Sequence, residues 1–345
     1  NPYYHFEYEM HTDSLTEDLR YRWTHSDPKS LEVLKNVFQI SLDAGAKTIM
    51  LMADDFVPHE NDYRKLYSLY TEEDKKKFVN LQNAHAFLIN SLYDWLKMYY
   101  PGTRFEFCPP WYLNEFIDKS RGRAEQYFRD LILQIPEDIA IIWTGPTVRS
   151  LMYDDIDFFR YEKLIKRKPM IWDNTLYARE LTGKYGGYPA MYPGKVRMCN
   201  IFEPYDVLVP KDFYQYIDGP HMYINGAALS ETYKIKYSTV ADFEWNNNAY
   251  NPDLSLWKTL VSDFGKEPAI HLLQFNDAYY GLTDVCMKID RGGNLNKLQK
   301  QGESHSEKLH LLYSKLCGEL KNNPKLIKEI TGKKEEIINR YQNLL

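Results

Sequence analysis

Short apolar runs alternate with longer amphipathic stretches over the first two-thirds of this 345-residue chain. The run Lys47–Ala53 (KTIMLMA) is typical, since a continuous apolar run of this length indicates a strand buried on both faces. The predicted strands are Tyr3–Met10, Lys47–Ala53, Arg104–Cys108, Ile139–Trp143, Pro169–Trp172 and Met222–Asn225. Strands that alternate with helices form parallel sheets with right-handed crossovers, so the sequence predicts an α/β protein.

The stretches between these strands carry helix signals. The helix Ser26–Ala44 is capped by Ser26 or Asp27, has Pro28 in its first turn, and is ended by Gly45. Further helices are predicted at Glu72–Met98, Arg121–Gln134, Ile156–Lys166 and Ser230–Phe243, and the pair Asp154–Asp155 is interpreted as the cap of the helix from Ile156. These helices supply the crossovers that a parallel sheet requires.

From about residue 251 the pattern is helical only. Apolar stripes recur at Leu309, Leu312, Leu316 and Leu320, and again at Ile327, Ile330, Ile337 and Ile338. We therefore expect two domains: residues 1–250 as a catalytic (β/α) barrel that is incomplete at its N-terminus, and residues 251–345 as an α-helical domain.

Polar residues directly follow the predicted strands. They are Asp54-Asp55, Tyr112, Thr144, Asp173-Asn174 and Asn225. In a (β/α)8 TIM-like barrel these positions line the C-terminal face, where active sites are built. A doubly wound sheet would also bind ligands at strand ends, but no glycine-rich phosphate loop follows any strand here. The six predicted strands therefore favour an eight-stranded barrel without its first two units.

The pair Asp54–Asp55 is the sharpest candidate for chemistry. Two carboxylates at the end of a buried strand are costly unless they are used, and close carboxylates push their pKa values apart. One can then stay protonated while the other is an anion, as glycosidic bond cleavage requires. The alternative is a strand-end turn with one Asp as a cap and the other in solvent. The run Trp172-Asp173-Asn174 offers an aromatic floor with polar groups, which suits a pyranose, although a core Trp with a helix cap fits equally.

Composition excludes several classes of function. The net charge of −5 gives no reason to expect nucleic acid, and no stretch is long and apolar enough to span a membrane. The four cysteines are scattered without metal-ligand spacing, so we expect no metal and no cofactor. The 29 Tyr, 16 Phe and 7 Trp suit a sugar-binding cleft, and suit a Tyr-rich core equally well.

Taken in order, six segments resemble glycoside hydrolase family 84, the retaining β-N-acetylglucosaminidases that include O-GlcNAc hydrolases. They are IMLMADDF (Ile49–Phe56), NAHAFLINSLYDWL (Asn83–Leu96), FCPPWY (Phe107–Tyr112), IIWTGPTV (Ile141–Val148), IWDN (Ile171–Asn174) and the stretch from Asn225 through ADFEWNNNAYNP (Ala241–Pro252). The resemblance implies hydrolysis of a glycan or glycoconjugate in which the substrate's own acetamido oxygen forms an oxazoline. It implies that Asp54 holds and polarises the acetamido group, and that Asp55 protonates the leaving oxygen and then acts as the base for the incoming water. It also implies sugar contacts from Tyr112, Thr144, Val148, Trp172, Asn174 and Asn225.

Two positions depart from the family pattern. Arg179 stands where the family carries an Asp that binds the sugar's O4 and O6. The substrate can therefore be an acidic or differently substituted glycan. The Gly and Lys that the first two barrel strands supply have no counterpart, so we expect a preceding segment or another chain to complete the barrel. A carbohydrate-binding barrel without activity and a conventional two-carboxylate glycosidase remain alternatives.

Overall fold

The computed structural model describes residues 24–54, 71–175, 202–219, 221–225 and 230–345. Within these residues one five-stranded sheet has the order β1-β2-β3-β4-β5. Its strands are β1 (Thr48–Met52), β2 (Arg104–Cys108), β3 (Ala140–Trp143), β4 (Met170–Asp173) and β5 (Tyr223–Ile224). The pairs β1–β2, β2–β3 and β3–β4 are parallel, which confirms the predicted α/β class. The predicted strand Tyr3–Met10 lies outside the described residues.

The strand register aligns one row of side chains on one face of the sheet, which we call the inner face. Met52 pairs with Cys108 and Ile142 pairs with Met170. We call these four residues the inner row. Successive side chains of a strand alternate between faces, so Phe107 and Trp143 lie on the opposite, outer face.

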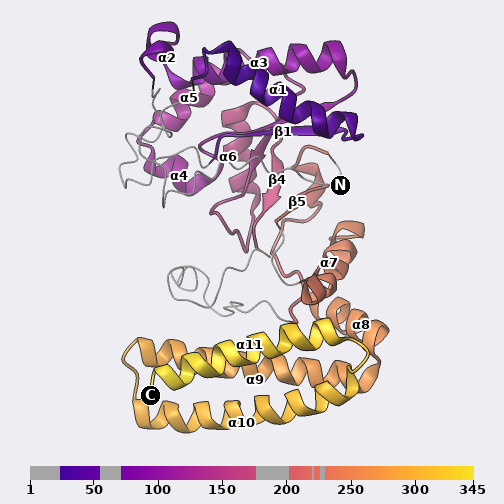
Figure 1. Cartoon of the computed structure of the whole chain (residues 1–345). Helices are drawn as coiled ribbons and strands as arrows, with labels where there is room; N and C mark the ends of the chain where they lie inside the picture. Colours follow the sequence, from indigo (N-terminus) through magenta and orange to yellow (C-terminus); the bar gives the residue numbers. More distant parts are fainter. Residues whose placement is uncertain (1–23, 55–70, 176–201, 220, 226–229) are drawn as a thin grey trace. The chain divides into compact units, whose positions relative to one another are not determined.

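Helices cover the outer face (Figure 1). They are α1 (Pro28–Asp43), α3 (Leu81–Tyr99), α5 (Arg123–Ile132) and α6 (Asp155–Ile165). The ring of His85 in α3 packs edge-on against Phe107 at 5.7 Å, and Tyr161 in α6 stacks on Trp143 at 5.2 Å. These aromatic contacts join the helix layer to the sheet.

The start of α1 agrees with the sequence, whereas the next helix does not. Asp27 caps α1 by accepting a hydrogen bond from the backbone of Lys29, and Gly45 follows the helix with φ +97°. The predicted single helix Glu72–Met98 is wrong, because the chain forms α2 (Glu72–Lys77) and then α3. Phe78 adopts an extended conformation, and the Asn80 side chain accepts the N–H of Asn83 and begins a new helix.

The C-terminal helices form a compact unit with its own core. It contains α7 (Ser230–Trp245), α8 (Pro252–Phe264), α9 (Lys266–Asp290), α10 (Leu295–Glu319) and α11 (Pro324–Asn343). Figure 1 shows α9, α10 and α11 side by side, and the Leu309 and Leu316 side chains are buried in the core. The Glu329 carboxylate of α11 accepts the N–H groups of Glu231 and Thr232 at the start of α7.

The unit thus includes α7, upstream of residue 250, and the domain boundary at 250 stays a prediction. The helical unit comprises Asn174–Val207 and Ile224–Leu345. The residues up to Asp173, together with Leu208–Tyr223, form the sheet unit, which also holds the short helices α4 (Asn114–Lys119) and η4 (Phe213–Gln215). Among the helices that the structure describes, none has the length and apolar character needed to cross a membrane.

Candidate functional site

The C-terminal ends of β1, β3 and β4 carry three predicted site residues at one edge of the sheet. Thr144 and Trp172 each come two residues after a member of the inner row, so the strand alternation places them on the same face. Asp54 follows β1 at the same edge of the sheet. Asp54 is half-buried in a bend just after β1, Thr144 is buried, and Trp172 is half-buried. Asp55 lies outside the described residues.

Backbone hydrogen bonds join the loop after β2 to the turn after β3. The N–H of Thr144 donates to the carbonyl of Tyr112 at 2.9 Å. The N–H groups of Asn114 and Glu115 donate to the carbonyls of Gly145 and Pro146, at 3.1 and 3.0 Å. The two segments that carry Tyr112 and Thr144 are therefore held together like neighbouring strands, beyond the end of the sheet itself.

The turn after β3 is closed by its own side chains. The Thr144 hydroxyl donates to the carbonyl of Thr147 at 3.0 Å, and the Ser150 hydroxyl accepts the N–H of Thr147 at 3.1 Å. The Tyr153 hydroxyl donates to the carbonyl of Thr144 at 3.1 Å. Because these polar groups are buried and paired, the turn presents Val148 in a fixed, half-buried position.

An apolar cluster on the inner face brings the loop residues together. Tyr112 belongs to this cluster, and Val148 and Trp172 pack against it. The ring of Tyr112 meets Phe116 edge-on at 5.7 Å, and Trp172 contacts Tyr223 at 5.8 Å. The structure therefore gathers Tyr112, Val148 and Trp172 at one end of the sheet, with Thr144 bonded to the same loop.

The two predicted amides are bonded to each other. The Asn225 side chain donates to the Asn174 side-chain oxygen at 2.9 Å, although 51 residues separate them. Each follows a strand, β5 or β4, as predicted. Paired amides fix each other's orientation, which suits groups that bind the hydroxyls of a sugar. Arg179 lies outside the described residues.

A second pair of hydrogen-bonded polar side chains was not predicted from the sequence. The Asn114 side chain in α4 donates to the Asp157 carboxylate in α6 at 2.9 Å. Burial, and next the Asp154 carboxylate, raise the pKa of Asp157. Asp154 itself caps α6 by accepting the N–H of Asp157, as predicted. The sequence gives no signal for the Asn114–Asp157 bond, because the short helix α4 was not predicted.

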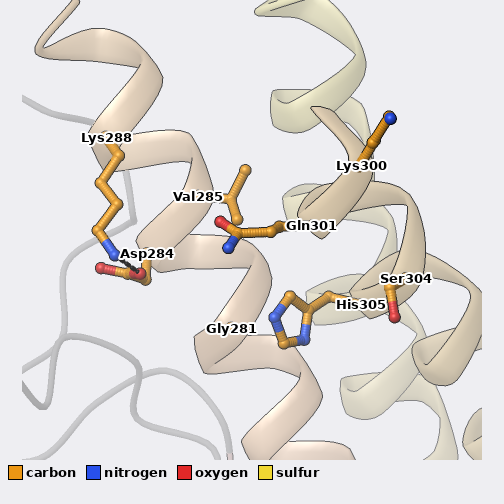
Figure 2. Close-up of a pocket in the computed structure, with 8 residues that line it drawn as sticks. All are labelled: Gly281, Asp284, Val285, Lys288, Lys300, Gln301, Ser304 and His305. Carbon is orange, nitrogen blue, oxygen red and sulfur yellow. Dashed lines mark hydrogen bonds and ion pairs between the residues drawn. The ribbon is translucent and has the colours of Figure 1, made fainter. Parts of the chain in front are cut away.

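A cavity of about 380 Å³ lies elsewhere, between α9 and α10 (Figure 2). Lys288 is paired with Asp284 at 2.5 Å, and Lys300 and Ser304 point away from Val285. Polar groups that diverge do not make a binding site, so the candidate site stays at the sheet. Over the described part of the chain, no group of three or more His, Cys, Asp or Glu residues could hold a metal ion.

A parallel α/β sheet with a carboxylate, hydroxyls and aromatic rings at the C-terminal ends of its strands defines a class of proteins that bind their ligands at this edge. A family model described as beta-N-acetylglucosaminidase matches residues 5–178. The chain belongs to this family of β-N-acetylglucosaminidases, glycoside hydrolase family 84, which confirms the resemblance seen in the sequence.

Individual relatives share part of the chain. Protein O-GlcNAcase of Rattus norvegicus is 30% identical over 151 residues, which are 44% of this chain and 15% of that protein. Protein O-GlcNAcase of Mus musculus is 29% identical over 151 residues, with the same shares. An O-GlcNAc hydrolase variant of Thermobaculum terrenum is similar in structure, with a TM-score of 0.66 and 20% identity over 93% of this chain and 65% of that one. The chain thus spans 15% of the length of these curated relatives, and the solved structure supports the fold.

Proposed function

We propose that the protein is a glycoside hydrolase that removes terminal β-linked N-acetylglucosamine from glycans or glycoconjugates. The observation that carries this proposal is Asp54, the first of two adjacent carboxylates, at the C-terminal end of β1 and at the same edge of the sheet as Thr144 and Trp172 in a member of this family. Catalysis is retaining and substrate-assisted, through an oxazoline intermediate.

The reaction needs two different tasks from the adjacent carboxylates. Asp54 accepts the acetamido N–H and turns the acetamido oxygen toward the anomeric carbon. That oxygen forms a bond to the anomeric carbon while the glycosidic bond breaks, and Asp55 gives its proton to the leaving oxygen. In the second step Asp55 takes a proton from water, the water oxygen bonds to the anomeric carbon, and the oxazoline reopens to the acetamido group.

The surrounding side chains fit the binding of one N-acetylated pyranose. The Tyr112 hydroxyl donates a hydrogen bond to the acetamido oxygen, Thr144 and Val148 line the pocket, and Trp172 forms a wall against the apolar face of the ring. The paired amides Asn174 and Asn225 contact the sugar hydroxyls.

We also propose that the sheet is part of a (β/α)8 barrel. Ile142 and Met170 of the inner row are fully buried, although the helices lie on the other face. Burial of both faces is expected for a sheet that curves around its own inner side chains.

The test compares two aryl glycosides that differ only at carbon 2. The substrate-assisted reaction loses its nucleophile when the 2-acetamido group is replaced by a hydroxyl, so kcat/KM should fall by on the order of 10³-fold or more. Equal rates on both substrates would establish the conventional two-carboxylate mechanism instead. Binding of N-acetylglucosamine in calorimetry without turnover of either glycoside would show a carbohydrate-binding barrel, the function that Arg179 in place of an Asp favours.

A further inference from the structure

Two polar contacts join the short helix α4 to α6. The Asn114 side chain donates to the Asp157 carboxylate at 2.9 Å, and Arg160 pairs with Asp118 one turn further on. Asp118 and Arg160 are exposed at the surface, where an ion pair contributes little. Asn114 is only 3% exposed, so its bond to Asp157 is the buried contact between the two helices.

Asn114 is the first residue of α4 and fixes where this helix begins. The preceding residue, Leu113, makes no side-chain capping bond. The first N–H groups of the helix, from Asn114 and Glu115, donate instead to the carbonyls of the turn after β3. The backbone and the side chain of Asn114 thus tie the start of α4 to both β3 and α6.

Helix α4 in turn supports a ring of the candidate site. Phe116, in the first turn of α4, meets the Tyr112 ring edge-on at 5.7 Å with an interplanar angle of 77°. Tyr112 is itself buried, and its carbonyl is bonded to Thr144. A displacement of α4 therefore moves the side chain against which the Tyr112 ring packs.

The polar pair is costly as a purely structural contact. The Asn114 side-chain oxygen is buried and accepts no hydrogen bond from the residues that the structure describes. Burial, and then the nearby Asp154, also work against the charge of Asp157, although Arg160 lies close by. An apolar pair would fill the same space without leaving a buried acceptor unpaired. This energetic cost is explained if the direction and length of the Asn114–Asp157 hydrogen bond are needed to place α4.

We propose that Asn114 is a positioning residue for Tyr112. Its hydrogen bond to Asp157 seats α4 so that Phe116 holds the Tyr112 hydroxyl at the acetamido group of the substrate. This inference rests on the proposed function, because only a substrate-assisted reaction uses the acetamido oxygen in the bond-forming step.

The kinetic test uses the full chain and an aryl β-N-acetylglucosaminide. Asn114→Ala and Asp157→Ala should each lower kcat/KM on the order of tenfold, mainly through kcat, because a displaced group loses attack geometry. Asp157→Asn keeps an acceptor oxygen and should restore the wild-type rate. Glu115→Ala is the matched control, since the Glu115 side chain pairs with Lys119 inside α4, and its rate should not change.

A double-mutant cycle separates positioning from general stability. In a Tyr112→Phe background, Asn114→Ala should cause no further loss of kcat/KM, because the hydroxyl that it positions is gone. An equal loss in both backgrounds would overturn the proposal, as would wild-type kinetics of both alanine variants.

A spectroscopic arm decides the proposal without turnover. In protein labelled with 3-fluorotyrosine, the ¹⁹F signal of Tyr112 is the one that disappears in Tyr112→Phe. Asn114→Ala should shift or broaden this signal, and so should Asp157→Ala, which breaks the same bond from a half-buried position and serves if the first variant folds poorly. Asp157→Asn and Glu115→Ala should leave it unchanged. An unchanged signal in both alanine variants would overturn the positioning role. A wild-type protein without hydrolytic activity would overturn the proposed function alone.

Discussion

The adjacency of Asp54 and Asp55 limits the chemistry open to this site. A double displacement needs two carboxyl groups about 5 Å apart on opposite sides of the glycosidic bond. Neighbouring side chains of a regular strand point to opposite faces, but Asp54 lies in a bend beyond β1, where this alternation ends. Two adjacent carboxylates are then better suited to one orienting role and one proton-transfer role than to a nucleophile and an acid.

The two roles predict different responses to the leaving group. Asp55→Asn should lower kcat/KM by about 10²–10⁴-fold for a methyl or other poor leaving group, and far less for dinitrophenolate, which leaves without a proton. Asp54→Asn should lower both rates alike, because both substrates need the oriented acetamido group. Steady-state kinetics on the two glycosides measure the difference. Asp155→Asn, at the exposed second Asp of another Asp-Asp pair, is the control and should change neither rate.

At the scale of elements, the turn after β3 depends on one glycine. Gly145 has φ +102°, and a Cβ atom there would overlap the Ser150 hydroxyl and the Tyr153 ring. Gly145→Ala should therefore lower the free energy of unfolding by about 2–4 kcal/mol and reduce activity, because strain and overlap act together. Gly102 has φ +88° with no atom within 4 Å, so Gly102→Ala should cost only about 1 kcal/mol. Urea unfolding of both variants checks this, and equal losses would contradict it.

The sequence predicted those helices and strands well whose ends are set by interactions between neighbouring residues. Asp27 and Pro28 identified the start of α1, because a cap and a fixed φ act within one turn. Helix α4 escaped prediction because it is short and lacks a side-chain cap, and its first N–H groups bond to the turn after β3 instead. The same holds for the site: Thr144 directly follows β3 and Trp172 lies near the end of β4, so both were predicted, whereas the Asn114–Asp157 bond joins residues 43 positions apart.

Asp74 ties the segment before α1 to α2 and predicts a pH dependence. Its carboxylate accepts the N–H groups of His25 and Ser26 and the ring nitrogen of His25. Burial alone would raise the pKa of Asp74, but these hydrogen bonds outweigh it and hold the pKa well below its usual range. Because the folded-state pKa is depressed, the stabilisation is present above the unfolded pKa of about 4 and is lost as pH falls below it.

Asp74→Asn removes this titration. Thermal unfolding followed from pH 7 to pH 2.5 should show a lower transition temperature for the variant at pH 7, because buried N–H groups lose a charged acceptor. The difference should shrink below about pH 4, where the wild-type carboxylate begins to lose its advantage. A difference that stays constant over the whole range would show that Asp74 acts through packing and not through its charge.

At the scale of the whole molecule, the chain has separate cores in its two units. Ile142 lies in the inner-face cluster of the sheet unit, and Leu309 lies in the core of the helical unit; both are fully buried. Truncating either side chain to alanine leaves a cavity and should lower the free energy of unfolding by about 2–5 kcal/mol. Stability alone therefore does not distinguish the two positions.

Activity should distinguish them, because Ile142 stands two residues before Thr144 on the same face. Well below both unfolding transitions, Ile142→Ala should lower kcat/KM on an aryl β-N-acetylglucosaminide, since a cavity beneath Thr144 loosens the turn after β3. Leu309→Ala should leave kcat/KM near the wild-type value at that temperature. Ile142→Val, which removes one methyl group, should lie between wild type and Ile142→Ala in both stability and rate. A loss of activity in Leu309→Ala equal to that in Ile142→Ala would show that catalysis depends on the core of the helical unit as much as on the sheet.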